Sequence, residues 1–303
     1  MRSAIIPSCF NYIGGKTQLL PQILKHFPKN LEVFVDLFCG GCSVGINVKA
    51  KQIIFNDNHS KLIKLLENIK NIPYELFMQE IQTLIDAYSL SKSAVHGYKF
   101  YQSNSSIGLA KYNKLPFLKL REDYNTLIKN KQDNLFMFYT LIVYAFNNQI
   151  RFNQQGFFNL PVGKRDFNIN LQNKFIAFSK ALMQKNAIFN NKDFREFEIN
   201  SLPKDTLIYC DPPYLITNAP YNESNAWTIK EERDLLSLLD NADRKGLKFA
   251  LSNVLVSKNQ ENSLLKEWAK KYHCHYLEKS YANSNYQRKN KQAISMEVLI
   301  TNY

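Results

Sequence analysis

Residues 211–214 combine a carboxylate, two prolines and an aromatic ring, as Asp211, Pro212, Pro213 and Tyr214. They follow an apolar run predicted to be a strand, which places them at the carboxyl edge of a sheet, where α/β proteins bind ligands. An exocyclic amine has two N–H bonds. A carboxylate and a proline carbonyl can accept both, which steers the nitrogen lone pair toward an electrophilic methyl group, while the tyrosine offers a flat face to a base extruded from a duplex. All four residues are predicted to be catalytic; the alternative is a strand-ending Pro-Pro turn with a chance Asp and Tyr.

Two earlier acids also end short apolar runs. Asp36 closes the run 31–36, and Asp57 follows the run 52–55. Between them a turn containing Gly40 and a helix-like stretch complete the order strand, Gly turn, helix, strand and acid, which is the opening of a Rossmann-like unit. An acid in the place of Asp57 can accept hydrogen bonds from ribose hydroxyls. Because the glycines fit the dinucleotide fingerprint only loosely, an adenosine ligand without a pyrophosphate is favoured.

The segment Gly14-Gly15-Lys16-Thr17 looks like the end of a phosphate-binding P-loop. That motif needs a glycine at position 10, which is Phe10, and a preceding strand that the local sequence does not favour. We expect instead a Gly-Gly turn that brings the backbone and the ammonium of Lys16 close to an anionic group such as a carboxylate.

The rest of the chain predicts an α/β core interrupted by an insertion. The core is assigned to residues 1–88 and 171–303, and the inserted domain to residues 89–170, a stretch rich in Tyr, Asn, Lys and Phe. The pattern predicts helices over 60–88, 133–146, 175–183, 229–239 and 262–272, and further strands over 187–189, 206–210, 247–251, 275–277 and 294–301, the last two as a closing antiparallel pair.

The composition indicates which kinds of binding partner and which compartment to expect. The net charge of +13, from 39 Lys and Arg against 26 Asp and Glu, favours a polyanion such as nucleic acid, although an AT-rich coding bias would supply part of the Lys excess. The five cysteines are odd in number and lack metal-ligand spacing, so no metal is expected. No apolar run is long enough to cross a membrane. We expect a cytoplasmic protein, monomeric and without membrane contact.

These motifs resemble the Dam-type DNA adenine-N6 methyltransferases from one end of the chain nearly to the other. The resemblance is carried by Tyr12-Ile13-Gly14-Gly15-Lys16, FVDLFCGG at 34–41, Phe55-Asn56-Asp57, Asp211-Pro212-Pro213-Tyr214, Leu251-Ser252-Asn253 and the terminal EVLITNY. It implies a Rossmann-like α/β methyltransferase fold with an inserted, mainly helical target-recognition domain. It also implies methyl transfer from S-adenosyl-L-methionine to a flipped adenine in double-stranded DNA, by an orphan modification enzyme or as part of a restriction-modification system whose endonuclease is encoded separately.

The resemblance also implies the cofactor site. Tyr12 and Lys16 would lie at the methionyl end, Asp36 near the methionine ammonium, Asp57 at the ribose, and Asp193 near the adenine. The full set of expected cofactor-binding residues is Tyr12, Gly14, Gly15, Lys16, Asp36, Phe38, Gly40, Asp57, Asp193, Phe194 and Asp211.

Residues 146–165 resemble the family's target-recognition region. Arg can read guanine, Asn and Gln can read adenine, and Lys or Arg can hold phosphates, so the expected DNA-binding residues are Asn148, Arg151, Asn153, Lys164 and Arg165. The aromatic residues Phe146, Phe152, Phe157 and Phe158 are expected to form a small core. The basic residues 288–291 are expected in a solvated loop within reach of phosphates, and His273, His275 and Cys210 are expected only to pack.

Three alternatives stay open. Cytosine-N4 methyltransferases use the same geometry but usually carry Ser-Pro-Pro-Tyr, and protein-glutamine or RNA methyltransferases more often carry Asn-Pro-Pro-Tyr and lack this insertion. A DNA-binding module with an inactive methyltransferase fold is the third, and the intact Lys16, Asp57, Asp211 and Tyr214 argue against it. The sequence does not predict which DNA site is recognised.

Overall fold

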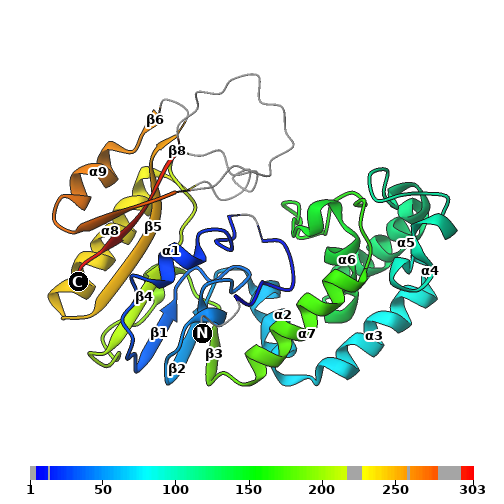
Figure 1. Cartoon of the computed structure of the whole chain (residues 1–303), viewed down its shortest axis with the longest axis horizontal. Coiled ribbons are helices and arrows are strands. Elements are labelled where there is room, and N and C mark those ends of the chain that lie inside the picture. Colours follow the sequence, from blue (N-terminus) through cyan, green and yellow to red (C-terminus); the bar gives the residue numbers. More distant parts are fainter. Residues whose placement is uncertain (1–4, 13, 217–226, 258–259, 279–294) are drawn as a thin grey trace.

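A single twisted sheet organises the protein (Figure 1). The computed structural model describes residues 5–12, 14–216, 227–257, 260–278 and 295–303. In this part of the chain the strand order is β3-β2-β1-β4-β5-β8-β7, with β6 paired to β5. The strands are β1 (Val33–Asp36), β2 (Gln52–Asn56), β3 (Ala187–Asn190), β4 (Thr206–Cys210), β5 (Lys248–Ser257), β6 (Gln260–Glu261), β7 (His273–Leu277) and β8 (Ser295–Thr301). Strands β1 to β5 pair in parallel, and β8 pairs antiparallel with both β5 and β7. The predicted α/β fold and its closing antiparallel pair are confirmed.

The direction in which the chain winds across the sheet changes between β1 and β4. Strands β2 and β3 lie on one side of β1, and β4 and β5 lie on the other. At such a point the loops leave the sheet in opposite directions and a crevice opens at the carboxyl ends of the strands. Asp36 pairs with Phe55 of β2 and Tyr209 of β4. Asp57 and Asp211, each two residues further on, therefore lie at the same edge as Asp36.

Both faces of the central strands are covered, which explains why these strands are continuous apolar runs. Every residue of β1 and of β4 is buried. Helices α8 (Ile229–Arg244) and α9 (Ser263–Ala269) contribute Leu235, Leu239 and Leu265 to the core on one face. On the other face Phe34 and Tyr209 stack in the core that continues into the helices α2 to α7.

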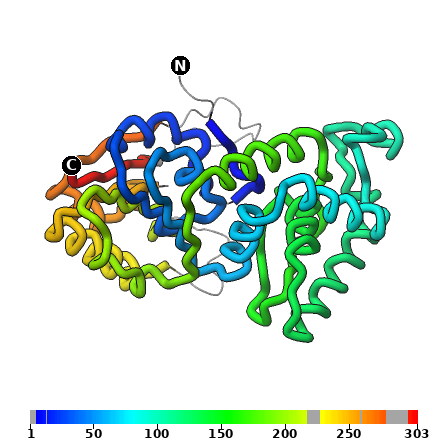
Figure 2. The backbone as a smooth tube through the Cα atoms, turned by 90° about the horizontal axis from the view of Figure 1, so that it is seen from below, coloured from blue at the N-terminus to red at the C-terminus, as the bar shows by residue number. Residues whose placement is uncertain are grey.

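These helices form a lobe beside the sheet, as Figures 1 and 2 both show. The helices of the lobe are α2 (Ser60–Asn71), α3 (Tyr74–Ala87), α4 (Ser93–Phe100), α5 (Ala110–Lys129), α6 (Leu135–Tyr144) and α7 (Ile169–Met183). The short helix α1 (Leu20–Leu24) precedes β1. Helix α6 is buried along residues 137–144, so it is the centre of the lobe. The ring of Phe77 in α3 lies 5.0 Å from Phe136 in α6 and 4.9 Å from Phe175 in α7, so the core crosses the predicted boundary at residue 88 without a break. The division at residues 89–170 stays a prediction.

The sequence patterns misjudged two segments. The helix-like stretch after Gly41 is only a three-residue 3-10 turn, Gly45–Asn47. The backbone becomes extended at Val48, and the side chain of Asn47 bonds the backbone of Ile6 and Ser43. Helices α4 and α5 were not expected as such. Helix α5 contains Pro116, which lacks the N–H that a helix needs, and this residue disguised a helix of 20 residues.

The continuity of this core gives a stability prediction. Phe77 is fully buried, whereas its neighbour Leu76 on the same helix is 48 % exposed. Phe77→Ala is expected to lower the free energy of unfolding by about 3–5 kcal/mol because it leaves a cavity among three helices. Leu76→Ala is the matched control and is expected to cost less than about 1 kcal/mol. Denaturant unfolding followed by circular dichroism measures both; equal effects would contradict the packing.

Candidate active site

The ammonium of Lys16 forms an ion pair with the carboxylate of Asp211. Nζ of Lys16 lies 2.7 Å from Oδ1 of Asp211 and also donates to the carbonyl of Gly14, at 3.1 Å. The hydroxyl of Tyr214 donates to the same Oδ1 at 3.0 Å, and Nζ of Lys16 lies 5.0 Å from the centre of the Tyr214 ring. The expected approach of Lys16 to a carboxylate is confirmed. Residues from the N-terminal segment and from the end of β4 therefore form one charged cluster.

Burial acts against this ion pair. The side chain of Asp211 is only 18 % exposed. Burial raises the pKa of Asp211, and the ammonium of Lys16 and the hydroxyl of Tyr214 counteract part of that rise. Lys16 first and Tyr214 second therefore favour the ionised form of this carboxyl, against the effect of burial.

Asp36 and Asp57 are held by backbone amides. Asp36 accepts the N–H of Gly45 at 3.0 Å, and Asp57 accepts those of Gly40 at 2.9 Å and His59 at 2.9 Å. Burial raises the pKa of Asp36 to about 7; the hydrogen bond from Gly45 opposes this rise, and the nearby carboxylates add to it. Burial also raises the pKa of Asp57. Both acids shape the glycine turn, and their expected contacts with a cofactor stay predictions.

Tyr12 lies directly on the glycine turn. Gly40 has a φ of +45°, and a Cβ atom there would lie 2.7 Å from the Tyr12 ring. Only glycine combines this left-handed conformation with so close an approach. The turn after β1 and the N-terminal segment with Gly14, Gly15 and Lys16 thus meet at the carboxyl edge.

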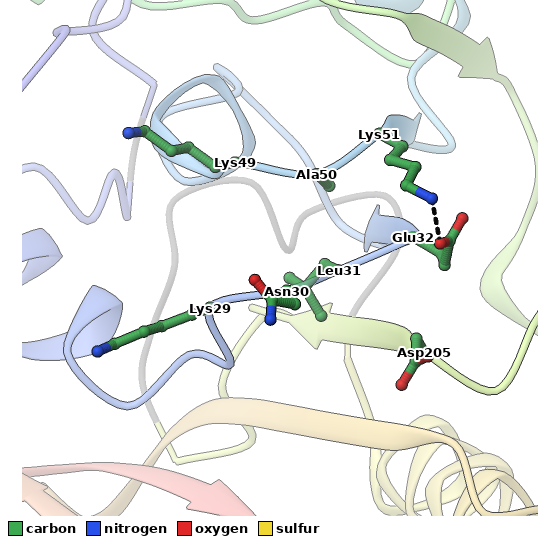
Figure 3. A pocket seen from close by; sticks show the side chains of 8 residues that line it. All are labelled: Lys29, Asn30, Leu31, Glu32, Lys49, Ala50, Lys51 and Asp205. Atoms are coloured by element: carbon green, nitrogen blue, oxygen red, sulfur yellow. Dashed lines mark hydrogen bonds and ion pairs between the residues drawn. The ribbon is translucent and has the colours of Figure 1, made fainter.

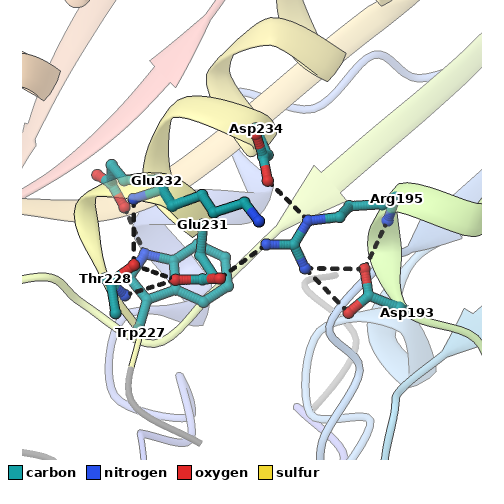
Figure 4. A network of polar contacts seen from close by, with 8 residues as sticks. Asp193, Arg195, Trp227, Thr228, Glu231, Glu232 and Asp234 are labelled. Atoms are coloured by element: carbon teal, nitrogen blue, oxygen red, sulfur yellow. Dashed lines mark hydrogen bonds and ion pairs between the residues drawn. The ribbon is translucent and has the colours of Figure 1, made fainter.

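The turn after β3 brings Asp193 and Phe194 to the same edge. Asp193 accepts the N–H of Arg195 and forms an ion pair with its guanidinium, with N–O distances of 3.2 Å (Figure 4). Phe194 is buried, and its ring lies 5.5 Å from Phe38 and 5.6 Å from Trp227. Sequence reasoning missed Trp227, although the capping sequence Thr228-x-x-Glu231 could have placed it directly before a helix.

The expected DNA-binding residues fall into two groups. Arg151 and Asn153 belong to a hairpin-like segment with bridges between Ala145 and Val162 and between Phe152 and Phe158. Arg151 donates to the side chain and the carbonyl of Asn159, and Asn153 accepts the N–H groups of Gln155 and Phe157, which closes the tip.

Lys164 and Arg165 lie away from that tip, against the loop before α5 and against α4. Nζ of Lys164 lies 3.5 Å from the carbonyl oxygen of Ser106, and Arg165 donates to the hydroxyl of Tyr98 at 3.2 Å.

Two expectations for this segment need correction. Asn148 is buried and donates to the carbonyl of Val143, so its side chain holds the turn after α6. Phe158 is buried as expected for a small core, but Phe146 is 48 % exposed and does not belong to one.

Of the three residues expected only to pack, Cys210 and His275 do so, whereas His273 is exposed at the start of β7. Cys210 is fully buried in the core, and the ring of His275 stacks on that of His26 at 3.9 Å. Within the described residues, the acid, His and Cys side chains form no group of three that could hold a metal. The basic residues 288–291 lie outside the described part of the chain.

A surface hollow of about 510 Å³ lies at the opposite edge of the sheet (Figure 3). It is lined by Lys29, Asn30, Leu31, Glu32, Lys49, Ala50, Lys51 and Asp205. Asp205 directly precedes β4, whereas Asp211 directly follows it. The hollow is therefore separate from the charged cluster, and its Lys51 is already paired with Glu32.

A mostly parallel sheet with an Asp-Pro-Pro-Tyr motif at the carboxyl end of a central strand defines an α/β methyltransferase. The family model "D12 class N6 adenine-specific DNA methyltransferase" matches residues 12–283. The chain belongs to this family.

Individual relatives agree with this assignment. The chain is 40% identical to the type II methyltransferase M.FokI of Planomicrobium okeanokoites over 307 residues, which cover 99% of this chain and 43% of that protein. It is 39% identical to the modification methylase StsI of Streptococcus sanguinis, with 98% and 43% covered. It is 24% identical to the DNA adenine methylase of Salmonella typhi, with 85% and 82% covered. The chain thus spans less than half the length of the first two relatives.

No helix among the described residues is both long and apolar enough to cross a membrane.

The raised pKa of Asp36 gives a pH prediction. Below a pH of about 7 this carboxyl is protonated and cannot pair with a cationic ligand. The affinity for a cationic ligand such as S-adenosylmethionine is therefore expected to fall as the pH is lowered through 7, by up to about tenfold per pH unit. The contribution of Asp36 to folding stability has the opposite sign, because its raised pKa makes the folded protein lose stability as the pH rises from about 4 to 7.

Calorimetric titrations at several pH values measure this dependence. The Asp36→Asn variant is expected to bind S-adenosylmethionine weakly, with an affinity that does not change with pH around 7. The Asp205→Asn variant, altered at the other edge of the sheet, is expected to show the same pH dependence of affinity as the wild type. A wild-type profile in Asp36→Asn would exclude Asp36 as the titrating group.

Proposed function

We propose that this chain transfers the methyl group of S-adenosylmethionine to the N6 atom of an adenine in double-stranded DNA. The observation that carries the proposal is Asp211-Pro212-Pro213-Tyr214 at the carboxyl end of β4, with Asp211 ion-paired to Lys16 beside the buried Asp36. The family description and the printed names of the relatives support adenine as the target base and DNA as the substrate.

The charge of the site fits a cationic cofactor. Asp36 and Asp57 are buried and Asp211 is nearly so, while Lys16, paired with Asp211, is the buried cation among the described side chains at this edge. A buried surplus of negative charge is costly unless a cation balances it. The sulfonium and ammonium of S-adenosylmethionine supply such charges, with Asp36 assigned to the ammonium and Asp57 to the ribose. When bound, this cofactor provides the electrophilic methyl group.

The chain's own residues hold the target amine. Lys16 and Tyr214 both contact Oδ1 of Asp211, so Oδ2 is assigned to one N6 hydrogen and the carbonyl of Pro212 to the other. Tyr214 provides the face on which the flipped base stacks. Adenine N6 is a weak nucleophile because its lone pair is conjugated with the ring. A fixed geometry in line with the methyl group supplies several kcal/mol of the barrier.

The lobe of helices is assigned to DNA binding. Arg151 and Asn153 at the hairpin-like segment, together with Lys164 and Arg165, give it hydrogen-bond donors for bases and phosphates. The excess of 13 positive charges supports a polyanionic partner. Since one of the relatives is described as a modification methylase and another as a type II methyltransferase, a separately encoded endonuclease is the second expected partner. A cytoplasmic monomer remains our expectation.

Asp211→Ala tests the catalytic assignment. The variant is expected to lose at least about a hundredfold in methyl transfer, because it removes an acceptor that orients the amine, while cofactor binding largely survives. Transfer of tritiated methyl groups to unmethylated DNA, with analysis of the labelled base, measures this. Asp205→Ala at the other end of β4 is the control and should behave as wild type. Retained turnover in Asp211→Ala, or label in N4-methylcytosine or protein, would refute the proposal.

Arg151→Ala tests the DNA-binding assignment. The variant is expected to bind target DNA about 5–100-fold more weakly or with relaxed sequence preference, since a base contact of this kind is worth about 1–3 kcal/mol. Arg244→Ala, which changes another exposed arginine at the end of α8, is the matched control. Unchanged affinity and preference in Arg151→Ala would show that the lobe reads DNA elsewhere.

A further inference from the structure

Three aromatic rings meet at the carboxyl edge of the sheet. Phe38 follows β1, Phe194 follows β3 and Trp227 precedes α8, and their ring centres lie 5.5, 5.6 and 5.8 Å apart. Phe194 is only 4 % exposed, and the guanidinium of Arg195 lies 4.7 Å from its ring. Phe38 and Trp227 are half-buried. The inner ring therefore supports two rings that keep part of their surface open.

A buried carboxylate fixes the indole of Trp227. Nε1 of Trp227 donates to Oε2 of Glu232 at 2.6 Å. Oε1 of Glu232 accepts from Asn253 in β5 at 3.3 Å and from Asn262 before α9 at 2.9 Å. Glu232 is fully buried, and a buried acid is costly unless donors surround it. Three donors from three segments converge on the carboxylate of Glu232. Because this carboxylate is fixed, it holds the indole of Trp227 in one orientation.

The same turn of α8 also holds Asp193, as Figure 4 shows. Glu231 and Asp234 accept from Arg195 at 2.9 and 2.7 Å, and Arg195 in turn holds both carboxylate oxygens of Asp193. Glu231 also closes a capping box with Thr228, which fixes the start of the helix. The first turn of α8 thus positions the ring of Trp227 through Glu232 and the carboxylate of Asp193 through Arg195.

These groups suit an aminopurine. Flat rings favour a flat heterocycle, and Asp193, whose side chain is 40 % exposed, can accept a hydrogen from an exocyclic amine. The groups lie at the edge that also carries Asp36 and Asp57. We propose that Trp227 is a wall of the pocket for the adenine ring of the methyl donor and that Glu232 is its positioning residue. This inference rests on the proposed function, because it presupposes an adenosyl ligand.

Tryptophan fluorescence tests the contact directly. The chain has two tryptophans, and Trp268 belongs to α9, where its N–H donates to Asp240 of α8. In a Trp268→Phe protein Trp227 is the sole tryptophan, and its emission is expected to change saturably with S-adenosylhomocysteine and with adenosine. Emission unaffected by saturating ligand would overturn the contact.

Calorimetry with the same two ligands tests the energetics. Trp227→Leu is expected to weaken the binding of S-adenosylhomocysteine and of adenosine by the same factor, about tenfold, because both ligands stack their adenine on this ring. Trp227→Phe keeps a flat ring and should retain most of the affinity, and Trp268→Phe should bind as wild type. Glu232→Gln should weaken both ligands by a smaller, again equal, factor.

The outcomes separate this inference from the proposed function. Wild-type protein that fails to bind S-adenosylhomocysteine would contradict the proposed function itself. Wild-type binding together with unchanged binding in a folded Trp227→Leu would overturn only the assignment of Trp227. A loss seen for S-adenosylhomocysteine but not for adenosine would place Trp227 away from the adenine and overturn it equally.

Discussion

The buried ion pair between Lys16 and Asp211 is the interaction on which the site depends. Several carboxylates converge where β1, β2 and β4 end, and in a buried setting each raises the cost of ionising the next. Lys16 lies 2.7 Å from Asp211 and opposes that cost at the residue assigned to the target amine. Asp36 and Asp57 are held by backbone amides instead, so the acids that would meet the cofactor also determine the shape of the glycine turn.

The pair also links two distant parts of the fold. Lys16 belongs to the N-terminal segment, whose Cys9 carbonyl accepts the hydroxyl of Tyr139 from the centre of the helical lobe at 3.2 Å. Asn11 of the same segment donates to the carbonyl of Asn147, where the hairpin-like segment begins. The lobe assigned to DNA is thus fastened to the N-terminal segment that carries Lys16. A base delivered by the lobe and the carboxylate that receives it share one structural frame.

Short-range patterns predicted the parts of the structure that depend on burial alone. The central strands were found because a parallel strand with two covered faces is a continuous apolar run, and the acids followed from the ends of those runs. The turn at Asn47 and the helix through Pro116 were missed because the first is held by contacts far apart in sequence and a proline disguises the second. Trp227 and Glu232 gave little signal because two of the donors that hold Glu232 come from β5 and from the turn before α9, far away in the sequence.

Sequencing of modified bases in DNA from a host that expresses this chain tests the central claim most directly. The account predicts N6-methyladenine at one defined sequence motif, present with the wild-type chain and absent without it. N4-methylcytosine at such a motif, or no modified base despite soluble, folded protein, would contradict it.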